Sequence, residues 1–290
     1  MPRVDVIVAV RNEEQNIPVF LEKLSALALP SPVTLKVIFV EDSSTDGTRV
    51  LLRRLAGENP LVGYYTLARG FGQGPAVIFG LSRSTADAMI MMDADGSHPL
   101  DVLPEMLREY LGGAQVVQCV RKTLANRKAY RDIGAGTFQV FARILTGIDT
   151  TEQNIFFRLI SAEVAHEILQ QPRYWRWLRF PLPRRPEGAL RKIYVDSQER
   201  VLGQSKYDFR RLVNLAIDGV LSLIPTARFV TLLILMVVGA TLLVLGGVWP
   251  VAVLVAVGLF WLVGRYVRLQ RDDVLRRMQV VECANVAAPS

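Results

Sequence analysis

Short apolar runs alternate with segments of helical spacing through the first part of the chain. The runs 4–10, 34–40, 61–67 and 87–93 predict strands, and 12–27, 46–57 and 72–84 predict helices. Asn12 is the expected cap of the first helix, and Ser44 or Thr45 that of the second. Strands and helices that alternate in this way predict a parallel α/β sheet, which binds ligands at the carboxyl ends of its strands.

A second, denser apolar pattern follows. Residues 229–248 contain no charged side chain, and about 20 such residues cross a bilayer as a helix. Residues 251–264 form a shorter run, which spans if Arg265 reaches the interface and which could otherwise be re-entrant. Arginines flank the pair on both sides, so we expect a hairpin with both ends in the cytoplasm. A helical hairpin buried in a soluble protein is the alternative.

The two patterns divide the chain into four segments. Residues 1–200 form the expected α/β domain, 201–227 a juxtamembrane amphipathic helix, 228–267 a two-helix transmembrane anchor and 268–290 a basic cytoplasmic tail. The N-terminal apolar run is too short for a signal peptide, so we expect a protein of the cell membrane whose α/β domain lies in the cytoplasm.

The charge balance agrees with a membrane location. The mean hydropathy is +0.27, and the formal net charge is +7. Basic residues outnumber acidic ones between positions 173 and 211, where they could hold anionic lipid headgroups. We therefore expect a membrane partner and no nucleic acid.

Acidic side chains follow three of the predicted strands, at 11–14, 41–46 and 93–98. Taken singly, each also fits a turn or the first turn of a helix. Together they indicate a phosphate-bearing ligand and a hard cation, Mg²⁺ or Mn²⁺, which would offset the repulsion between Asp93 and Asp95. The chain lacks a glycine-rich phosphate loop, which argues against a kinase or a dinucleotide-binding enzyme.

Six blocks of sequence resemble a known family. They are VIVAVRNEEQNI, VEDSSTDGT, LARGFGQGPAVIFGL, MMDADGSHPLD, NIFFRLIS (154–161) and RVLGQSKY (200–207). In this order they resemble glycosyltransferase family 2, and within it the polyprenyl-phosphate hexose synthases, the dolichyl-phosphate mannose synthase group. The two-span anchor is similar to bacterial members that use undecaprenyl phosphate. The resemblance implies a GT-A fold: a Rossmann-like, mostly parallel α/β domain followed here by a transmembrane helical hairpin.

The resemblance also implies roles for individual residues. It casts Asp93 and Asp95 as the metal ligands, and these two with Arg121 and Arg200 as the catalytic set. The nucleotide-sugar site would comprise Ala9, Arg11, Glu13, Asp42 and Asp93. The lipid-phosphate site would comprise Arg121, Arg131, Arg200, Ser205 and Lys206.

Several positions depart from the family pattern. Ala9 and Arg11 stand where Pro and an aromatic residue are usual, and Glu41 stands where Asp is usual. Gly70 replaces an Asn, and Ser97 replaces a Gln, which leaves a third metal ligand open. The carboxylates of the expected metal site are all present.

The expected activity is inverting hexose transfer from GDP-mannose or UDP-glucose to polyprenyl phosphate, an EC 2.4.1-type reaction. A phosphate monoester is already anionic near neutral pH, since its second pKa is about 6, and the sequence shows no convincing general base. One alternative is a family-2 transferase that acts on a saccharide hydroxyl. Another is a non-catalytic membrane scaffold of the same fold. The sequence leaves three points open: the sugar, the choice between a dolichyl and an undecaprenyl acceptor, and a homo-oligomeric state.

Overall fold

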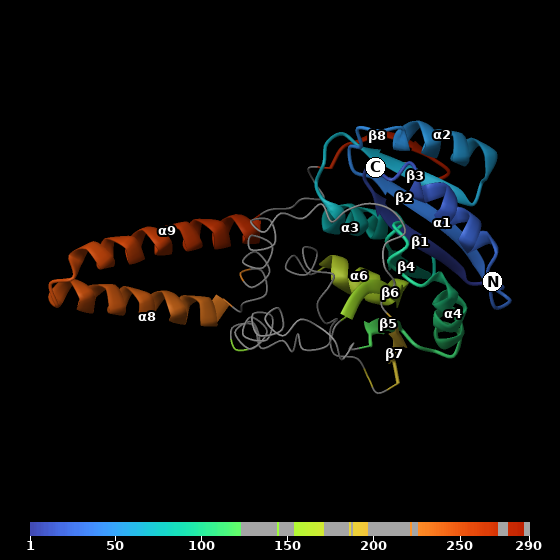
Figure 1. Ribbon diagram of the computed structural model, residues 1–290. Helices are drawn as coiled ribbons and strands as arrows, with labels where there is room; N and C mark the ends of the chain where they lie inside the picture. The colour runs from blue at the N-terminus through green and yellow to red at the C-terminus, as the bar shows by residue number, and fades with distance from the viewer. Residues whose placement is uncertain are drawn as a thin grey trace.

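The computed structural model describes residues 1–122, 144, 154–170, 186, 188–196, 221, 226–271 and 278–286. They form an α/β domain and a long helical hairpin that projects from one side of it (Figure 1). The two apolarity patterns of the sequence therefore correspond to two structural parts.

An eight-stranded sheet runs through the α/β domain in the order β7-β5-β6-β4-β1-β2-β3-β8. Strands β4, β1, β2 and β3 are parallel, β6 is antiparallel to β4 and β5, and β8 is antiparallel to β3. The mostly parallel sheet and its four predicted strands are confirmed. The strands are β1 (Arg3–Val10), β2 (Thr34–Glu41), β3 (Val62–Leu67), β4 (Ala88–Met92), β5 (Val116–Arg121), β6 (Asn154–Ser161), β7 (Leu190–Val195) and β8 (Val280–Ala284).

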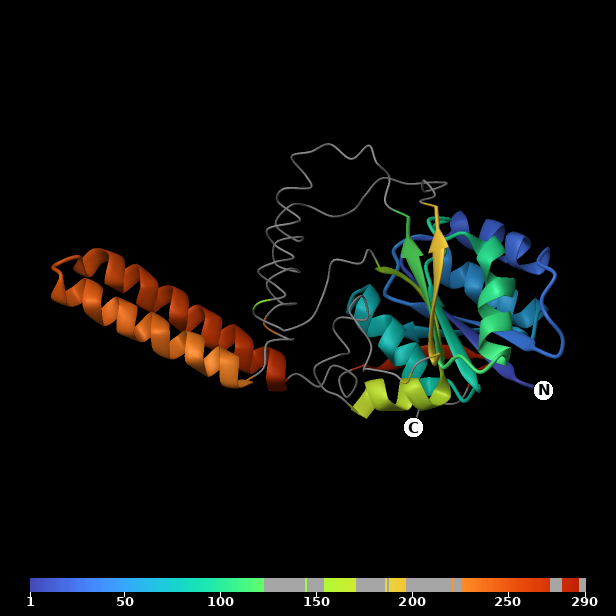
Figure 2. The same cartoon turned by 90° about the horizontal axis from the view of Figure 1, so that it is seen from below.

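Helices cover both faces of the sheet (Figure 2). One face carries α1 (Asn16–Ser25), α2 (Thr48–Glu58) and α4 (Leu103–Leu111), which follows a short 3₁₀ turn, Leu100–Val102. The other face carries α3 (Gln73–Arg83) and α6 (Ala162–Gln170). The three helices predicted between the strands are confirmed.

Two predicted helix caps are wrong. Helix α1 begins at Asn16, with Gln15 as its N-cap, and Asn12 instead accepts a hydrogen bond from the amide of Thr45. Helix α2 begins at Thr48 after Gly47, while the Ser44 hydroxyl accepts from the amide of Asn12. The polar residues expected to cap helices therefore join the two loops to each other.

The core has one layer on each face of the sheet because side chains alternate along a strand. In β1, Val4, Val6 and Val8 pack under α1 and its neighbours, while Ile7 packs under α3. Gly80 lets α3 approach the sheet, because a Cβ there would overlap the Ile7 side chain. The buried strands fix the positions of the loops that follow them.

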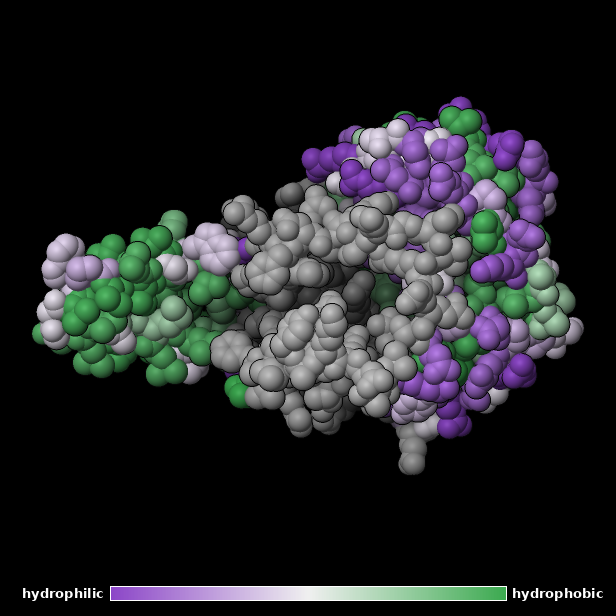
Figure 3. Space-filling view, viewed as in Figure 1, coloured by the Kyte–Doolittle hydropathy of each residue, from purple (hydrophilic) through white to green (hydrophobic). Residues whose placement is uncertain are grey.

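The hairpin consists of α8 (Thr226–Leu245) and α9 (Trp249–Arg271). Both helices are long and apolar enough to cross a membrane, and only 6% and 11% of their most apolar windows are buried within the described structure. Leu254 is 72% exposed and Phe260 84%, and Figure 3 shows a hairpin surface that is mostly hydrophobic. An apolar surface of this extent indicates a membrane or protein contact.

The C-terminal segment differs from its predicted form. The sequence predicts a basic tail at 268–290, but Val280–Ala284 form β8, the strand beside β3 at one edge of the sheet. A strand of five residues that pairs with a strand more than 200 positions earlier in the chain could not be predicted from the local sequence pattern. The sheet is therefore completed by residues beyond the predicted domain boundary at 200. The predicted helix at 201–227 lies outside the described residues, except Leu221 and the first residues of α8.

Candidate active site

The loops after β1, β2, β3 and β4 meet at one edge of the sheet. The strand register aligns Val8 with Met92 and Val10 with Glu41, so these strands end at similar heights. The acidic segments at 11–14, 41–46 and 93–98 therefore converge, as the sequence predicts.

The loops after β1 and β2 are joined by side chains. The Asn12 side-chain oxygen accepts from the Thr45 amide at 2.8 Å, and the Ser44 hydroxyl accepts from the Asn12 amide at 3.0 Å. A carboxylate oxygen of Glu14 accepts from the Gly47 amide at 3.0 Å. These contacts hold the two loops as one rigid wall of the site.

Glu13 and Asp46 stabilise the ends of the helices behind this wall. The Asn16 side chain donates to Glu13 at 2.6 Å, and the Glu13 amide donates to the Thr48 hydroxyl at 3.0 Å. Partial burial tends to raise the pKa of Asp46, but hydrogen bonds from Thr48 and Glu14 outweigh it and lower that pKa. The predicted contact between Glu13 and the nucleotide stays a prediction.

The adjacent acids Glu41 and Asp42 have separate partners. Glu41 is fully buried and accepts from the Ser44 amide and from the Arg49 guanidinium, at 3.2 and 3.3 Å for the latter. Asp42 is 3% exposed and accepts from the amides of Phe71 and Gly72, at 2.6 and 2.8 Å. Asp42 thus fixes the loop between β3 and α3, and its predicted contact with the nucleoside stays a prediction.

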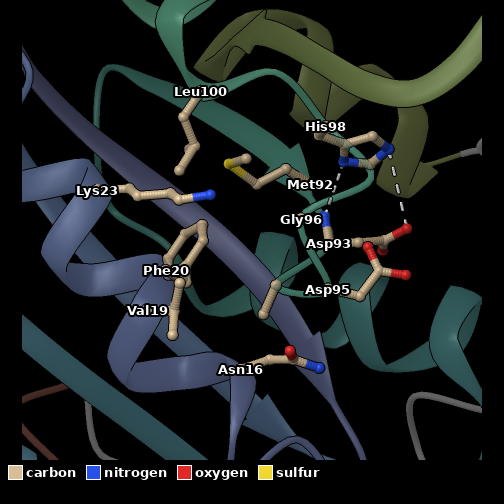
Figure 4. A pocket seen from close by; sticks show the side chains of 11 residues that line it. Asn16, Val19, Phe20, Lys23, Met92, Asp93, Asp95, Gly96, His98 and Leu100 are labelled. Carbon is tan, nitrogen blue, oxygen red and sulfur yellow. Dashed lines mark hydrogen bonds and ion pairs between the residues drawn. The ribbon is translucent and has the colours of Figure 1, made fainter. Parts of the chain in front are cut away.

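Asp93 and Asp95 follow β4 and present their carboxylates side by side (Figure 4). A carboxylate oxygen of Asp95 accepts from the Ser97 amide at 3.0 Å, which closes a tight turn. Gly96 has a φ of 76°, a conformation that side chains disfavour. The turn therefore directs two carboxylates towards the same space.

Two residues that sequence reasoning missed hold Asp93 in place. The Gln73 side-chain amide donates to one Asp93 carboxylate oxygen, and the Asp93 backbone amide donates to Nδ1 of His98 at 3.0 Å. Nε2 of His98 lies 3.8 Å from the second Asp93 oxygen, and the ring stacks on Phe157 of β6 at 5.2 Å between centroids. In the sequence, only the position of Gln73 at the start of a predicted helix could have suggested that it lies at this site.

The chemistry of this pair suits a hard divalent cation. Asp93 is 21% exposed and Asp95 is also partly exposed, and both line a pocket between α1 and the loop after β4. Within the described residues, no group of three or more His, Cys, Asp or Glu side chains could hold a metal ion. Mg²⁺ commonly takes one or two carboxylates and completes its coordination with phosphates and water. The residues present therefore fit a cation that is bound together with a diphosphate.

Ala9 and Arg11 lie in and just after β1. Ala9 is partly buried and packs with the core on the α3 face. Arg11 is exposed, and its guanidinium lies against Gly70 of the loop after β3. The structure therefore brings two departures from the family pattern into contact.

Residues 5–177 match the family described as Glycosyl transferase family 2. The chain belongs to glycosyl transferase family 2. It is 30% identical over 223 residues to a bactoprenol glucosyl transferase of Shigella phage SfX, covering 76% of this chain and 72% of that one. It is also 28% identical over 221 residues to the undecaprenyl-phosphate 4-deoxy-4-formamido-L-arabinose transferase of Pectobacterium carotovorum, covering 74% of this chain and 65% of that one. These relatives agree with the resemblance to polyprenyl-phosphate hexose synthases.

This glycosyl transferase also has a solved structural neighbour. Glucosyl-3-phosphoglycerate synthase from Mycobacterium tuberculosis, crystallised with Mn²⁺, UDP and glucosyl-3-phosphoglycerate, superposes with a TM-score of 0.51. The match covers 78% of this chain and 80% of that one at 15% identity. At this identity the match shows the fold alone, and the predicted GT-A fold is confirmed.

Most of the predicted lipid-phosphate residues of this glycosyl transferase lie outside the described part of the chain. The backbone of Arg121 ends β5, and Arg131, Arg200, Ser205 and Lys206 lie outside the described residues. The family's FRL block forms β6, where Arg158 is 1% exposed and burial lowers its pKa to about 10. The structure therefore describes the donor half of the predicted site.

Proposed function

We propose that this protein transfers a hexose, with inversion, from a nucleotide sugar to polyprenyl phosphate at the cytoplasmic face of the membrane. The observation that carries the proposal is the pair of converging carboxylates, Asp93 and Asp95, at the carboxyl edge of a family-2 fold that continues into an apolar hairpin. The product would be a polyprenyl-phosphate hexose.

On the donor side, the proposal assigns the diphosphate to Asp93 and Asp95 and the nucleoside to the loops that follow β1, β2 and β3. A bound Mg²⁺ or Mn²⁺ would neutralise the charge of the leaving nucleoside diphosphate. Gln73 and His98 hold Asp93 so that its orientation is set before the donor arrives. Preorganised groups of this kind need no rearrangement during the reaction.

On the acceptor side, a lipid phosphate oxygen would attack the anomeric carbon from the face opposite the diphosphate. The phosphate is already ionised near neutral pH, so the enzyme needs cations here and not a general base. Arg121, Arg131, Arg200, Ser205 and Lys206 remain the proposed phosphate ligands. The names of the relatives, which act on bactoprenol or undecaprenyl phosphate, support this acceptor class.

The proposal is tested with Asp95→Asn, which removes one negative charge and keeps the shape of the side chain. We expect the transfer of radiolabelled sugar to polyprenyl phosphate to fall at least about a hundredfold, a loss typical of removing charge stabilisation from a transition state. The melting temperature should change little, because Asp95 is partly exposed. Full turnover by this variant, or undiminished turnover by the wild type in EDTA, would exclude the metal role.

The same assay separates the rival activities. Transfer that depends on added polyprenyl phosphate supports the proposal, whereas transfer to a saccharide hydroxyl supports a polysaccharide-type enzyme, and no turnover supports a scaffold. UDP-glucose and GDP-mannose are compared as donors. The glucosyl transferases among the relatives favour UDP-glucose.

A further inference from the structure

We infer that His98 is a neutral positioning residue of the metal site and not a metal ligand, and that Phe157 of β6 holds it in that role. This role rests on the proposed function, because it concerns how the metal ligand Asp93 is held. It also bears on the third metal ligand, which the sequence leaves open at Ser97. Phe157 is itself a positioning residue, since it acts on Asp93 only through His98.

The hydrogen bond from the Asp93 backbone determines which nitrogen of His98 carries the proton. The Asp93 amide donates to Nδ1 at 3.0 Å, so Nδ1 is an acceptor and carries no hydrogen. In a neutral imidazole the hydrogen is then on the other nitrogen, Nε2. Figure 4 shows Nε2 turned towards the Asp93 carboxylate, and it lies 3.8 Å from one oxygen. The ring therefore faces the backbone of Asp93 with a lone pair and its carboxylate with an N–H group.

The same assignment leaves neither ring nitrogen with a lone pair for a cation. The lone pair of Nδ1 is directed at the Asp93 amide, and Nε2 carries the proton. An imidazole binds a metal through the lone pair of one nitrogen. In the part of the chain that the structure describes, no cluster of three His, Cys, Asp or Glu side chains could hold a metal ion, and a hard cation prefers oxygen ligands. The open coordination positions would therefore go to oxygen atoms of the donor diphosphate or of water.

Phe157 fixes the plane of the His98 ring. The two rings are stacked with 5.2 Å between centroids and an interplanar angle of 11°. His98 is 6% exposed and Phe157 is fully buried, so the imidazole cannot tilt without losing this contact. The backbone of Phe157 is held in turn, because its carbonyl oxygen accepts from the Gln118 side chain of β5 at 3.5 Å. A side chain without a flat ring at 157 would let the imidazole turn, so that Nε2 would no longer face Asp93.

The stack also connects the metal site to the strands beyond β4. Strand β6 pairs with β4, which leads into Asp93, and with β5, which ends at Arg121, a predicted ligand of the lipid phosphate. A substitution in β6 should therefore change the affinity for the cation although it alters no metal ligand.

The first test asks whether His98 binds the cation directly. The full chain in detergent is studied with Mn²⁺ and UDP, and in parallel with Mn²⁺ and GDP, by electron spin echo envelope modulation, which detects nitrogen bound to Mn²⁺. We expect no coupling from a directly bound imidazole in the wild type, and the same spectrum in His98→Asn.

The second test measures Mn²⁺ affinity by titration followed by electron paramagnetic resonance. The side-chain oxygen of asparagine can replace Nδ1 as an acceptor, but asparagine has no group at the position of Nε2. His98→Asn should therefore bind Mn²⁺ about tenfold more weakly. Phe157→Leu should weaken binding about three- to tenfold, the size expected for the loss of one ring stack. Adding Phe157→Leu to His98→Asn should cause no further loss, because Phe157 acts through the imidazole.

Phe156→Leu is the matched control. Phe156 is the preceding residue of β6 and is 6% exposed, but it packs on the opposite face of the sheet. Both single Phe variants should lower the melting temperature, and only Phe157→Leu should change Mn²⁺ affinity. Phe157→Met and Phe156→Met, which keep more of the side-chain volume, give the same comparison if a Leu variant folds poorly.

The outcomes separate this inference from the proposed function. A directly bound imidazole nitrogen, wild-type affinity in His98→Asn, or an equal change of affinity in the Phe157 and Phe156 variants would overturn the inference while the metal role of Asp93 and Asp95 stands. A wild-type chain that binds no Mn²⁺ with either nucleotide would overturn that metal role, and with it the proposed function as stated.

Discussion

At the scale of single residues, the contact between Gln73 and Asp93 shows how a neutral side chain can fix the orientation of a charged one. The Gln73 amide donates to Asp93 without bringing a positive charge that would compete with a bound cation. A hydrogen bond to a charged group contributes about 1.5 to 3 kcal/mol, and part of this would be recovered by water after truncation. Gln73 is therefore a positioning residue of the candidate metal site.

Gln73→Ala should weaken Mn²⁺ binding about five- to tenfold, because the Asp93 carboxylate loses its fixed orientation. The measurement is Mn²⁺ titration followed by electron paramagnetic resonance in the presence of a nucleoside diphosphate. Gln115→Ala is the matched control, since Gln115 also donates to a carboxylate, Glu163 at 2.9 Å, near the opposite ends of the strands. Equal Mn²⁺ affinity in both variants would show that Gln73 does not position Asp93.

The sequence was informative about residues whose role follows from local position. Asp93 and Asp95 could be predicted because they follow an apolar strand at the end where ligands bind. The partners of this site could not be predicted, because Gln73, which binds Asp93, comes from the start of α3, and Phe157, which stacks on His98, comes from a strand more than 50 positions later. Asn12 was misjudged for the same reason, since its partner lies in the next loop.

At the scale of elements, β8 is held against β3 and α2 by a network of polar side chains. Arg53 of α2 donates to both carboxylate oxygens of Glu282 at 2.6 and 2.7 Å, and the Tyr64 hydroxyl donates to Glu282 at 2.5 Å. The Asn285 side chain donates to the carbonyl oxygens of Ala56 and Val62 at 2.6 and 2.9 Å. The strand thus has specific contacts in addition to its backbone pairing.

This network makes the stability of β8 depend on pH. Hydrogen bonds from Arg53 and then Tyr64 lower the pKa of Glu282 from 4.5 to about 2. A lowered folded-state pKa contributes stability that is present above pH 4.5 and is lost as the pH falls towards 2. In urea unfolding, the midpoint should therefore decrease over this range more steeply in the wild type than in Glu282→Gln.

Glu58→Gln is the control for that measurement. Glu58 lies on α2 and, like Glu282, pairs with an arginine, here Arg54, but at 4.0 Å and on the exposed surface, where an ion pair contributes little. Its pH profile should follow that of the wild type. A Glu282→Gln profile that also follows the wild type would show that the network does not stabilise β8.

At the scale of the whole molecule, the position of β8 constrains the path of the chain. The polypeptide leaves the α/β domain before α8 and rejoins the same sheet after α9. If both helices cross a bilayer, both ends of the hairpin must lie on the side of the catalytic domain. This agrees with the positive residues that flank the hairpin on both sides.

The turn between the helices should therefore be accessible from the opposite side of the membrane. With both native cysteines replaced, Val248→Cys, which is 43% exposed between α8 and α9, should react with a membrane-impermeant maleimide only from that side. Glu58→Cys on α2 provides the control and should react from the domain side. Labelling of both sites from one side would indicate a hairpin that lies on the membrane without crossing it.

The order of the elements also governs how this protein can be made. A ribosome synthesises both hydrophobic helices before it reaches Val280, so both helices leave the ribosome while the β3 edge of the sheet still lacks its neighbour. An unpaired edge strand is a site of aggregation. If the hairpin enters the membrane during synthesis, its insertion therefore precedes the completion of the sheet by β8, and a nascent chain that fails to insert should be retained by chaperones or degraded before the α/β domain matures.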